Sequence, residues 1–346
     1  MPFYVQTVKP QKTHHTALLF ALLFALLAAA ALAALLFGSV SLQAEELFAG
    51  FFRGDEAAKN TTSWILLTTV RLPRMLGGCL AGMGLAAAGV ILQSVMNNAL
   101  ASPNTIGVNA GAGFGVMLCL LLFPGAYTLP PFFAFGGALV TALFIFLLAS
   151  AADASRTTII LAGIAVSAFL NAGINTLKLL DTDIAVDLTS FLIGSLSGLT
   201  LRALLLPACG ILAAFFAALL CARSLNLLAL GEETARSLGL RVAPMRFLLL
   251  LFASMLAGCS VSFAGLLSFA GLVVPHICRQ LFGSDARILL PASALLGASF
   301  VLFCDLLGRI LFAPFELPAG IPMALVGVPF FLYLLLKKKG GRRLYA

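Results

Sequence analysis

The sequence predicts an all-α polytopic membrane protein with about ten transmembrane helices. Of the 346 residues, 61% are hydrophobic and only 10% are charged, and the mean hydropathy is +1.09. Soluble domains average about 25% charged residues, so the shortage of charge along the whole chain excludes a soluble protein. The apolar runs are continuous rather than alternating, which excludes membrane-spanning strands. Helices remain, because they satisfy their own backbone hydrogen bonds in lipid.

Ten segments are apolar enough to count as spans, since a helix needs about 20 apolar residues to cross a bilayer. They lie near 16–38, 64–92, 105–123, 130–150, 157–180, 203–222, 243–263, 266–282, 288–312 and 321–336. Lys9 and Lys12 precede the first, as in a signal peptide. Its apolar core exceeds the usual 7–15 residues, so we expect a retained helix, with cleavage after Ala44 as the alternative.

The second and third segments form a hairpin around a polar break between Arg71 and Gly115. Arginines flank Pro73, a glycine- and alanine-rich run follows, and a second glycine-rich run ends the hairpin. The break contains Gln93, Asn97, Asn98, Ser102, Pro103 and Asn104. Glycine-rich helices pack closely in membranes. A simple anchor does not need the polar turn, whereas a transporter of polar solutes has a use for it.

Two intervals between the later segments also carry structure. The stretch DLTSFLIGSLSGL within 181–202 is too short to span, so we expect a re-entrant or interfacial helix. The interval 226–242 reads as helix-turn-helix, in which Gly239 ends one helix and Pro244 starts the next. An ordinary solvated loop would not need its apolar residues, which are available to dock a soluble partner: Leu227, Leu228, Leu230, Ala235 and Leu238.

The C-terminal third combines breaks and charges inside apolar segments. Pro275 breaks or kinks its helix. Asp305 and Arg309 are four residues apart and can pair on one face. Pairing matters, because each charge within a span costs about 2.5–3.5 kcal/mol. The sequence ELPAGIP at 316–322 is a rigid turn before the last segment.

Charge sets the expected orientation. Two thirds of the 21 lysines and arginines fall on the side of the N-terminus, which predicts that both termini are cytoplasmic. This asymmetry accounts for the net charge of +8 without nucleic acid. The seven cysteines contain no CxxC pair and are expected to be small buried hydrophobes. No residues have metal-ligand spacing, so we expect no metal site and no bound cofactor.

Several blocks resemble one family throughout residues 60–340. They are RLPR at 71–74, LQ at 92–93, NALASPNTIGVNAGAGFG at 98–115, GEETARSLGL at 231–240, FAGLVVPHICRQLFGSDARILLP at 269–291, and DLLGR, ELPAGI and LVGVPFFLYLLL within 305–336. In these blocks the chain resembles the permease subunits of type II ABC importers, the FecCD/BtuC group that imports ferric siderophores, haem or cobalamin. Ala99 departs from the pattern, which usually has proline there.

The resemblance implies the type II importer fold, with residues 1–346 as one transmembrane permease domain in the bacterial inner membrane. It implies a homodimer with the path on its two-fold axis, two cytoplasmic ATP-binding subunits and an extracytoplasmic solute-binding protein. The sequence has no GxxxxGK[ST], so ATP and Mg would be used by a partner and this chain would not be an enzyme. The expected cargo is a ferric siderophore, with haem or cobalamin as alternatives.

Other classes fit the residues less well. An ion-gradient-driven secondary transporter remains an alternative, but it would be expected to place ionisable residues at mid-membrane, where Asp305 is the main candidate. An intramembrane enzyme needs a catalytic pair such as Ser–His or two aspartates within the bundle, and the sequence pattern indicates no such pair. A structural scaffold does not predict the charged interval 226–242.

The resemblance also assigns roles to individual residues. Arg71, Arg74 and Arg309 would receive acidic groups of the binding protein, because a guanidinium holds a carboxylate at two points; interface anchoring is the alternative. The interval 226–242 would form the coupling helices that contact the ATPase, with Glu232, Glu233, Ala235, Arg236 and Gly239. Asn98, Leu100 and Thr157 would line the inner gate, and Gln93 the path to it; helix capping is the alternative for Asn98.

Overall fold

The computed structural model describes residues 13–43, 45–46, 61–104, 107–125, 129–151, 156–180, 189 and 191–340. These residues are helical with no strand among them, which confirms the all-α prediction. Each of the ten predicted apolar segments contains a helix: α1 (Thr13–Leu36), α5 (Leu72–Val95), α6 (Val108–Leu122), α7 (Pro130–Ala151), α8 (Arg156–Leu180), α10 (Leu201–Leu220), α13 (Val242–Ala264), α14 (Ala270–Phe282), α15 (Ala286–Ile310) and α16 (Gly320–Gly340). The short α4 (Thr62–Ile65) and the π-helical η2 (Leu66–Arg71) run directly into α5.

Five helices in the described part are long and apolar enough to cross a membrane: α1, the continuous α4–η2–α5 helix, α10, α13 and α15. By contrast, α6 has 15 residues and α14 has 13. At about 1.5 Å per residue these two rise only about 20 Å, less than the hydrocarbon core of about 30 Å. The prediction of one span over 266–282 is therefore wrong in detail, because residues 266–269 are not helical.

Left-handed backbone at both ends of this stretch delays the start of α14. Gly265 ends α13 with φ +67°, and Phe269 precedes α14 with φ +67°. A non-glycine residue rarely adopts this conformation, so Phe269 is held there by its surroundings. A side chain added at Gly327 of α16 would meet the Phe269 ring, which shows how closely this residue is packed.

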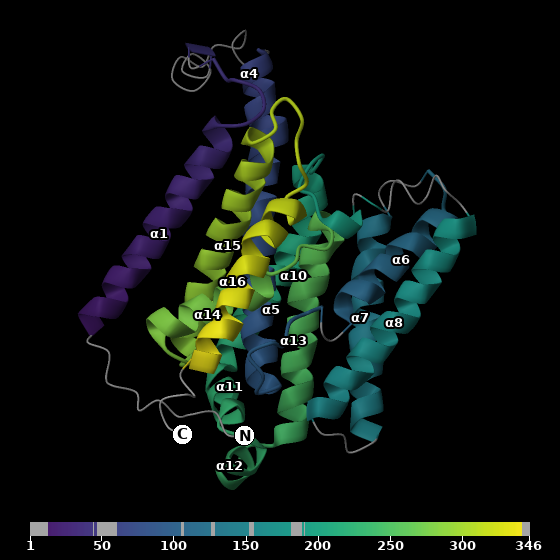
Figure 1. Cartoon of the computed structure of the whole chain (residues 1–346), viewed down its shortest axis with the longest axis vertical. Coiled ribbons are helices and arrows are strands. Elements are labelled where there is room, and N and C mark those ends of the chain that lie inside the picture. Colours follow the sequence, from purple (N-terminus) through teal and green to yellow (C-terminus); the bar gives the residue numbers. More distant parts are fainter. Residues whose placement is uncertain are drawn as a thin grey trace.

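Helix α5 lies at the centre of the bundle and touches its neighbours through backbone (Figure 1). A Cβ placed on Gly82 would lie 2.2 Å from the carbonyl oxygen of Gly297 in α15. One placed on Gly89 would lie 1.9 Å from the carbonyl oxygen of Gly271 in α14. The prediction that the glycine-rich helix packs closely is confirmed.

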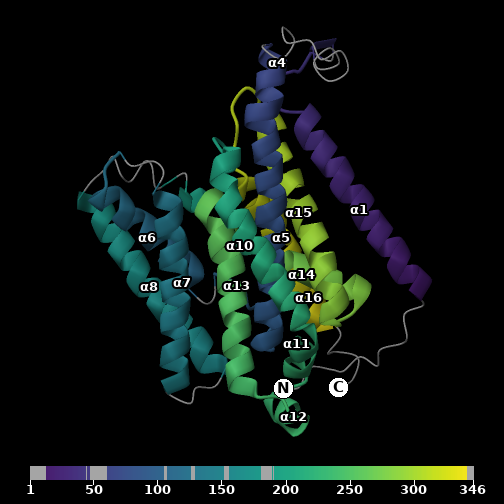
Figure 2. The ribbon, with the colours of Figure 1, turned by 180° about the vertical axis from the view of Figure 1, so that it is seen from behind.

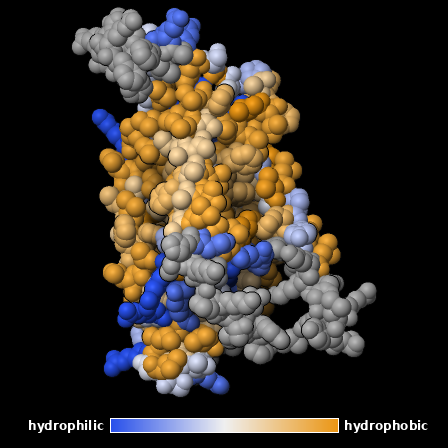
Figure 3. Space-filling view, turned by 90° about the vertical axis from the view of Figure 1, so that its left-hand side faces the viewer, coloured by the Kyte–Doolittle hydropathy of each residue, from blue (hydrophilic) through white to orange (hydrophobic). Residues whose placement is uncertain are grey.

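The helices divide into a main bundle and a lateral group. Helices α6, α7 and α8 lie together on one side of α13, and α1 lies on the opposite side of the bundle (Figures 1 and 2). Helix α4 lies at one end of the molecule, which we call the α4 end. Helices α11 (Ala222–Ala229) and α12 (Glu232–Ser237) lie at the other, which we call the α12 end. On the face shown in Figure 3, hydrophobic residues cover most of the middle of the molecule, and hydrophilic residues gather toward the α12 end.

The interval predicted to hold a re-entrant helix lies partly outside the described residues, which include 189 and 191–202 of it. Three backbone hydrogen bonds tie the described part to two other places in the chain, the end of α13 and the start of α16. Leu266 N–H donates to Phe191 O at 2.9 Å, Ser195 N–H to Ala264 O at 3.0 Å, and Gly320 N–H to Gly194 O at 3.0 Å. These bonds fix the ends of α13 and α16 around this segment.

Candidate functional site

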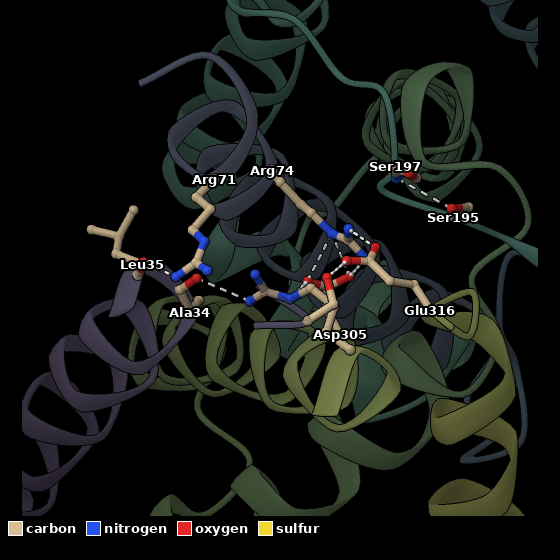
Figure 4. Close-up of polar contacts among 10 residues, drawn as sticks. Ala34, Leu35, Arg71, Arg74, Ser195, Ser197, Asp305 and Glu316 are labelled. Atoms are coloured by element: carbon tan, nitrogen blue, oxygen red, sulfur yellow. Dashed lines mark hydrogen bonds and ion pairs between the residues drawn. The ribbon is translucent and has the colours of Figure 1, made fainter. Parts of the chain in front are cut away.

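A buried cluster of charges joins three parts of the chain at the α4 end. Arg74 of α5 binds Asp305 of α15, with Nη2 at 2.9 Å and Nε at 3.0 Å from Oδ1. The same guanidinium donates through Nη1 to Glu316 Oε2 at 2.6 Å, in the loop before α16. Arg309 Nε lies 3.2 Å from Asp305 Oδ2 (Figure 4), which confirms the predicted pairing of Asp305 and Arg309. We call Arg71, Arg74, Asp305, Arg309 and Glu316 the arginine cluster.

Two arginines of this cluster cap the C-terminus of α1. Arg71 Nη1 donates to the carbonyl oxygens of Leu35 at 2.8 Å and Leu36 at 2.7 Å, and its Nη2 donates to Val40 O. Arg309 Nη2 donates to Ala34 O at 3.0 Å (Figure 4). The last carbonyls of a helix have no partners within it, so these bonds satisfy groups that would otherwise be unpaired.

The geometry corrects the expectation that these arginines are open receptors. Arg71, Arg74 and Arg309 are 3%, 5% and 3% exposed. Arg74 binds two carboxylates within the chain, and Arg71 and Arg309 donate to carbonyl oxygens of α1 and the residues after it. A guanidinium cannot offer the same N–H groups to a second protein at the same time. Of the cluster, Glu316 is the most open, with 32% of its side chain exposed. A docking role for the arginines therefore stays a prediction that requires the cluster to rearrange.

Glu316 is held ionised by its neighbours. Burial alone would raise the pKa of this carboxyl, but the hydrogen bond from Ser39 Oγ at 2.7 Å and the charges of Arg74 and Arg309 outweigh burial and lower the pKa below its ordinary value. A lowered pKa in the folded state contributes stability above the ordinary pKa of glutamate. That contribution is lost as pH falls through the lowered value.

The α12 end carries the second candidate site, the predicted interval 226–242. We call residues 222–242 the coupling segment, because α11 begins at Ala222, four residues before that interval. Its helix-turn-helix character is confirmed, although the break falls at Gly231 (φ +112°) and not only at Gly239. Gly239 ends α12 with φ +84°, as predicted. Leu240 N–H donates to Ala235 O and Gly239 N–H to Arg236 O, the Schellman pattern that satisfies the last carbonyls. Pro244 lies in the first turn of α13, also as predicted.

The predicted coupling residues separate into inward and outward groups. Glu232 binds Arg236 at 2.8 Å and Arg246 of α13 at 2.6 Å, so its carboxylate orients α12 within this chain. Ala235 is buried in this chain and is not available to a partner. Of the five apolar residues expected to dock a partner, Leu228 is also buried, whereas Leu230 and Leu238 are 52% and 58% exposed. Glu233, Arg236 and Gly239 are exposed.

Sequence reasoning missed a side chain of the coupling segment that contacts α15. Asn226 lies on α11 and bonds to Asp285 and Ala286 at the start of α15. The signal was weak, because an asparagine in a polar interval is unremarkable on its own. Glu316 was missed as a partner of Arg74 for a similar reason, since 242 residues separate the two in the chain.

Two of the predicted gate residues, Asn98 and Leu100, lie in the polar break after α5. Asn98 Oδ1 accepts from Leu100 N–H at 2.9 Å, and Ala101 N–H donates to Asn98 O at 3.1 Å. Ala99 thus fits a turn in which the usual proline is not required. Leu100 is exposed, and Thr157 lies in the first turn of α8, its side chain outside the described residues. Gate roles for Asn98, Leu100 and Thr157 stay predictions.

Gln93 does not line an open path in this conformation. Its side-chain amide Nε2 donates to Gly271 O at 3.2 Å, and its Oε1 accepts from Arg279 Nη1 at 2.8 Å. The side chain is buried and ties the end of α5 to α14. A place in the path would require α14 to move away from α5.

A cavity of about 150 Å³ lies where two non-helical stretches, residues 102–104 and 267–269, approach α5. Its lining residues are Leu85, Ser102, Pro103, Asn104, Asn109, Leu267, Ser268, Phe269, Gly271 and Leu272. Irregular backbone is tolerated at membrane depth where protein buries it or where it lines a cavity. Among the described residues there is no group of three or more His, Cys, Asp or Glu side chains arranged to hold a metal.

Comparisons with known proteins agree with one another. Residues 25–337 match the FecCD transport family. The chain is 41% identical over 273 residues to the Fe(3+)-citrate import system permease protein YfmE of Bacillus subtilis, covering 78% of this chain and 81% of that protein. It is 35% identical over 320 residues to the hemin transport system permease protein HmuU of Yersinia pestis, covering 90% and 94%. A solved inward-facing metal-chelate type ABC transporter superposes with a TM-score of 0.80 at 30% identity, covering 93% of this chain and 99% of that one.

Proposed function

Because the chain belongs to the FecCD transport family, as a permease of the metal-chelate type of ABC importer, we propose that it forms the path by which a ferric siderophore crosses the bacterial inner membrane. The observation that carries this proposal is the family match over residues 25–337. The cargo rests on the relatives, which are named for ferric citrate, siderophore and hemin transport. Haem and cobalamin are the alternative cargoes.

The energy source is a partner protein in this proposal. The sequence carries no phosphate-binding GxxxxGK[ST] loop, so two ATP-binding subunits hydrolyse ATP with Mg while this chain binds no cofactor. The runner-up, an ion-gradient-driven transporter, is less well supported. Asp305, its main ionisable candidate, is already paired with two arginines near one end of α15. A group engaged in this way is poorly suited to bind and release a coupling ion.

The proposed mechanism is alternating access in a homodimer with both termini cytoplasmic. Closure of the ATPase dimer moves the coupling segment at the α12 end, where Leu230, Leu238 and Glu233 are exposed for contact. The movement opens or closes a path on the two-fold axis, with Asn98, Leu100 and Thr157 at its inner end. The solute-binding protein delivers cargo at the α4 end.

Uptake into vesicles tests the function. The full complex, reconstituted with its ATPase and binding protein, is expected to import iron-55 bound to a siderophore when ATP is supplied on the ATPase side. Parallel arms use haem and cobalamin.

In the same complex, Asn98→Cys is expected to crosslink the two copies in one nucleotide state and not in another. Import that is unchanged without ATP and abolished by an ionophore would establish the gradient-driven alternative instead.

A matched pair of variants tests docking at the α4 end. Arg74→Lys keeps the positive charge that Asp305 needs but loses the planar fork that holds a carboxylate at two points. If the cluster rearranges to receive the binding protein, affinity is expected to fall about tenfold, equivalent to about 1.4 kcal/mol. The control is Arg202→Lys, at the exposed start of α10. The nearby Leu204 of α10 packs against Gly77 of α5, one turn from Arg74. Equal affinities for the wild type and Arg74→Lys, measured by titration, would rule docking through Arg74 out.

A further inference from the structure

Helix α11 of the coupling segment is joined to the bundle by an apolar face and by Asn226, whereas α12 is bound separately, through Glu232 to Arg246 of α13. In α11, Ala222, Leu225 and Leu228 are buried and form the face that packs on α5 and α15. Apolar packing of this kind is not directional. A surface that only buries leucine side chains lets one helix slide or rotate against another. A directional contact is needed to fix the position of α11 against a particular helix.

Asn226 supplies that contact through both atoms of its amide. Its Nδ2 donates to Asp285 Oδ1 at 2.8 Å, and its Oδ1 accepts from Ala286 N–H at 2.8 Å. Asp285 is the N-cap of α15, where the same Oδ1 accepts from Arg287 N–H at 3.0 Å. The first N–H groups of a helix lack partners within it. One of those of α15 is therefore satisfied by a side chain of the coupling segment.

Helix α15 connects this contact to the opposite end of the molecule. It has 25 residues and extends about 37 Å at 1.5 Å per residue. In its middle it is locked to α5 by the backbone contact of Gly82 and Gly297, and near its other end Asp305 binds Arg74. Close-packed interiors transmit displacement because they leave little free space. The two helices thus form one stiff unit from the coupling segment to the arginine cluster.

We propose that Asn226 is a positioning residue that joins the coupling segment to α15, so that ATP-driven movement of the segment displaces α15 and α5 together. The inference rests on the proposed function. It deepens that function by naming the joint through which movement enters the membrane helices. Without the joint, α11 slips on its apolar face, and ATP is hydrolysed without an equal amount of transport.

A reciprocal exchange of two residues tests the joint in the full reconstituted complex. Asn226→Asp places a carboxylate against the carboxylate of Asp285 and removes the donor at Nδ2. Asp285→Asn alone is mild, because its amide oxygen still accepts both hydrogen bonds and asparagine is a good N-cap. In the double variant Asn226→Asp/Asp285→Asn the donor and acceptor are exchanged, and the pair can form again.

The quantity measured is ATP hydrolysed per molecule of cargo imported. Asn226→Asp is expected to raise this ratio about fivefold, since loss of one hydrogen bond of about 1 kcal/mol shifts an equilibrium by about that factor. For Asp285→Asn and for the double variant, the ratio of ATP hydrolysed to cargo imported is expected to stay within about twofold of the wild-type ratio. Gly239→Pro serves as the uncoupled reference, because proline cannot adopt the φ of +84° found there.

The outcomes separate the inference from the function on which it rests. A wild-type complex that does not import cargo with ATP overturns the proposed function. Import by the wild type with an unchanged ratio in Asn226→Asp overturns the joint, and so does a double variant that fails to recover. Import and hydrolysis that fall together in Asn226→Asp, with a lowered unfolding temperature, also overturn the joint, because they show a role in folding alone.

Discussion

Asp305→Asn is expected to lower the free energy of unfolding by about 3–5 kcal/mol, the usual cost of removing one partner from a buried ion pair. Asp305 is the carboxylate shared by Arg74 and Arg309, and all three side chains are buried. Arginine stays protonated in proteins. The amide would therefore leave two guanidinium groups facing each other with only Glu316 to offset them. Unfolding of the detergent-solubilised protein by denaturant, with matched detergent, measures the effect.

A second substitution shows whether the loss is electrostatic. In the double variant Asp305→Asn/Arg309→Gln one positive charge is removed with the negative one, and Arg74 keeps Glu316. Replacement of both partners costs much less than removal of one, so part of the stability is expected to return. A cost below about 1 kcal/mol for Asp305→Asn, which is typical of a surface ion pair, would show that the cluster is open to water and not buried.

Gly82→Ala is expected to destabilise the protein by about 1–3 kcal/mol or more, as overpacked cores do. The sign is the informative part, because alanine in a helix interior is normally about 1 kcal/mol better than glycine. At Gly82 the added methyl would lie 2.2 Å from the carbonyl oxygen of Gly297 and 2.7 Å from Ala298 Cα. Neither is the end of a flexible side chain, so α5 and α15 would have to move apart.

The matched control is Gly136→Ala in α7. This glycine is also within a helix, but a Cβ there would meet no atom within 4 Å. The same change is therefore expected to stabilise the protein by up to about 1 kcal/mol. Thermal unfolding of the two variants beside wild type compares them. Stabilisation by Gly82→Ala would contradict the close approach of α5 and α15.

The fold was predictable because its signals are local. Continuous apolar runs marked all ten helix-containing segments, and Gly239 marked the end of α12 through its backbone freedom. The shortening of α14 was not predicted, because hydropathy does not distinguish an apolar helix from an apolar extended stretch. The left-handed Phe269 that separates them is set by surrounding helices, among them α16.

The sites were only partly predictable, since the partner of a charged residue depends on tertiary structure. The spacing of Asp305 and Arg309 gave their pairing, but nothing local indicated that Arg74 would complete it from 231 residues away. The family resemblance suggested that Arg71 receives the binding protein at the surface, whereas its side chain is buried and donates to carbonyl groups of α1. Similarly, Glu232 was expected to contact a partner, and its carboxylate is used within the chain.

The capping of α1 by arginines constrains the order of assembly during synthesis. The carbonyl group of Ala34 can be bound by Arg309 only after a further 275 residues have been synthesised. The partner of Leu35 and Leu36, Arg71, arrives much earlier. Since α1 precedes the other described helices in the chain, its C-terminus can be held by Arg71 early, but its full set of contacts forms only once Arg309 of α15 has been made. A chain truncated before α15 would keep α1 in the bilayer without fixing it to the bundle.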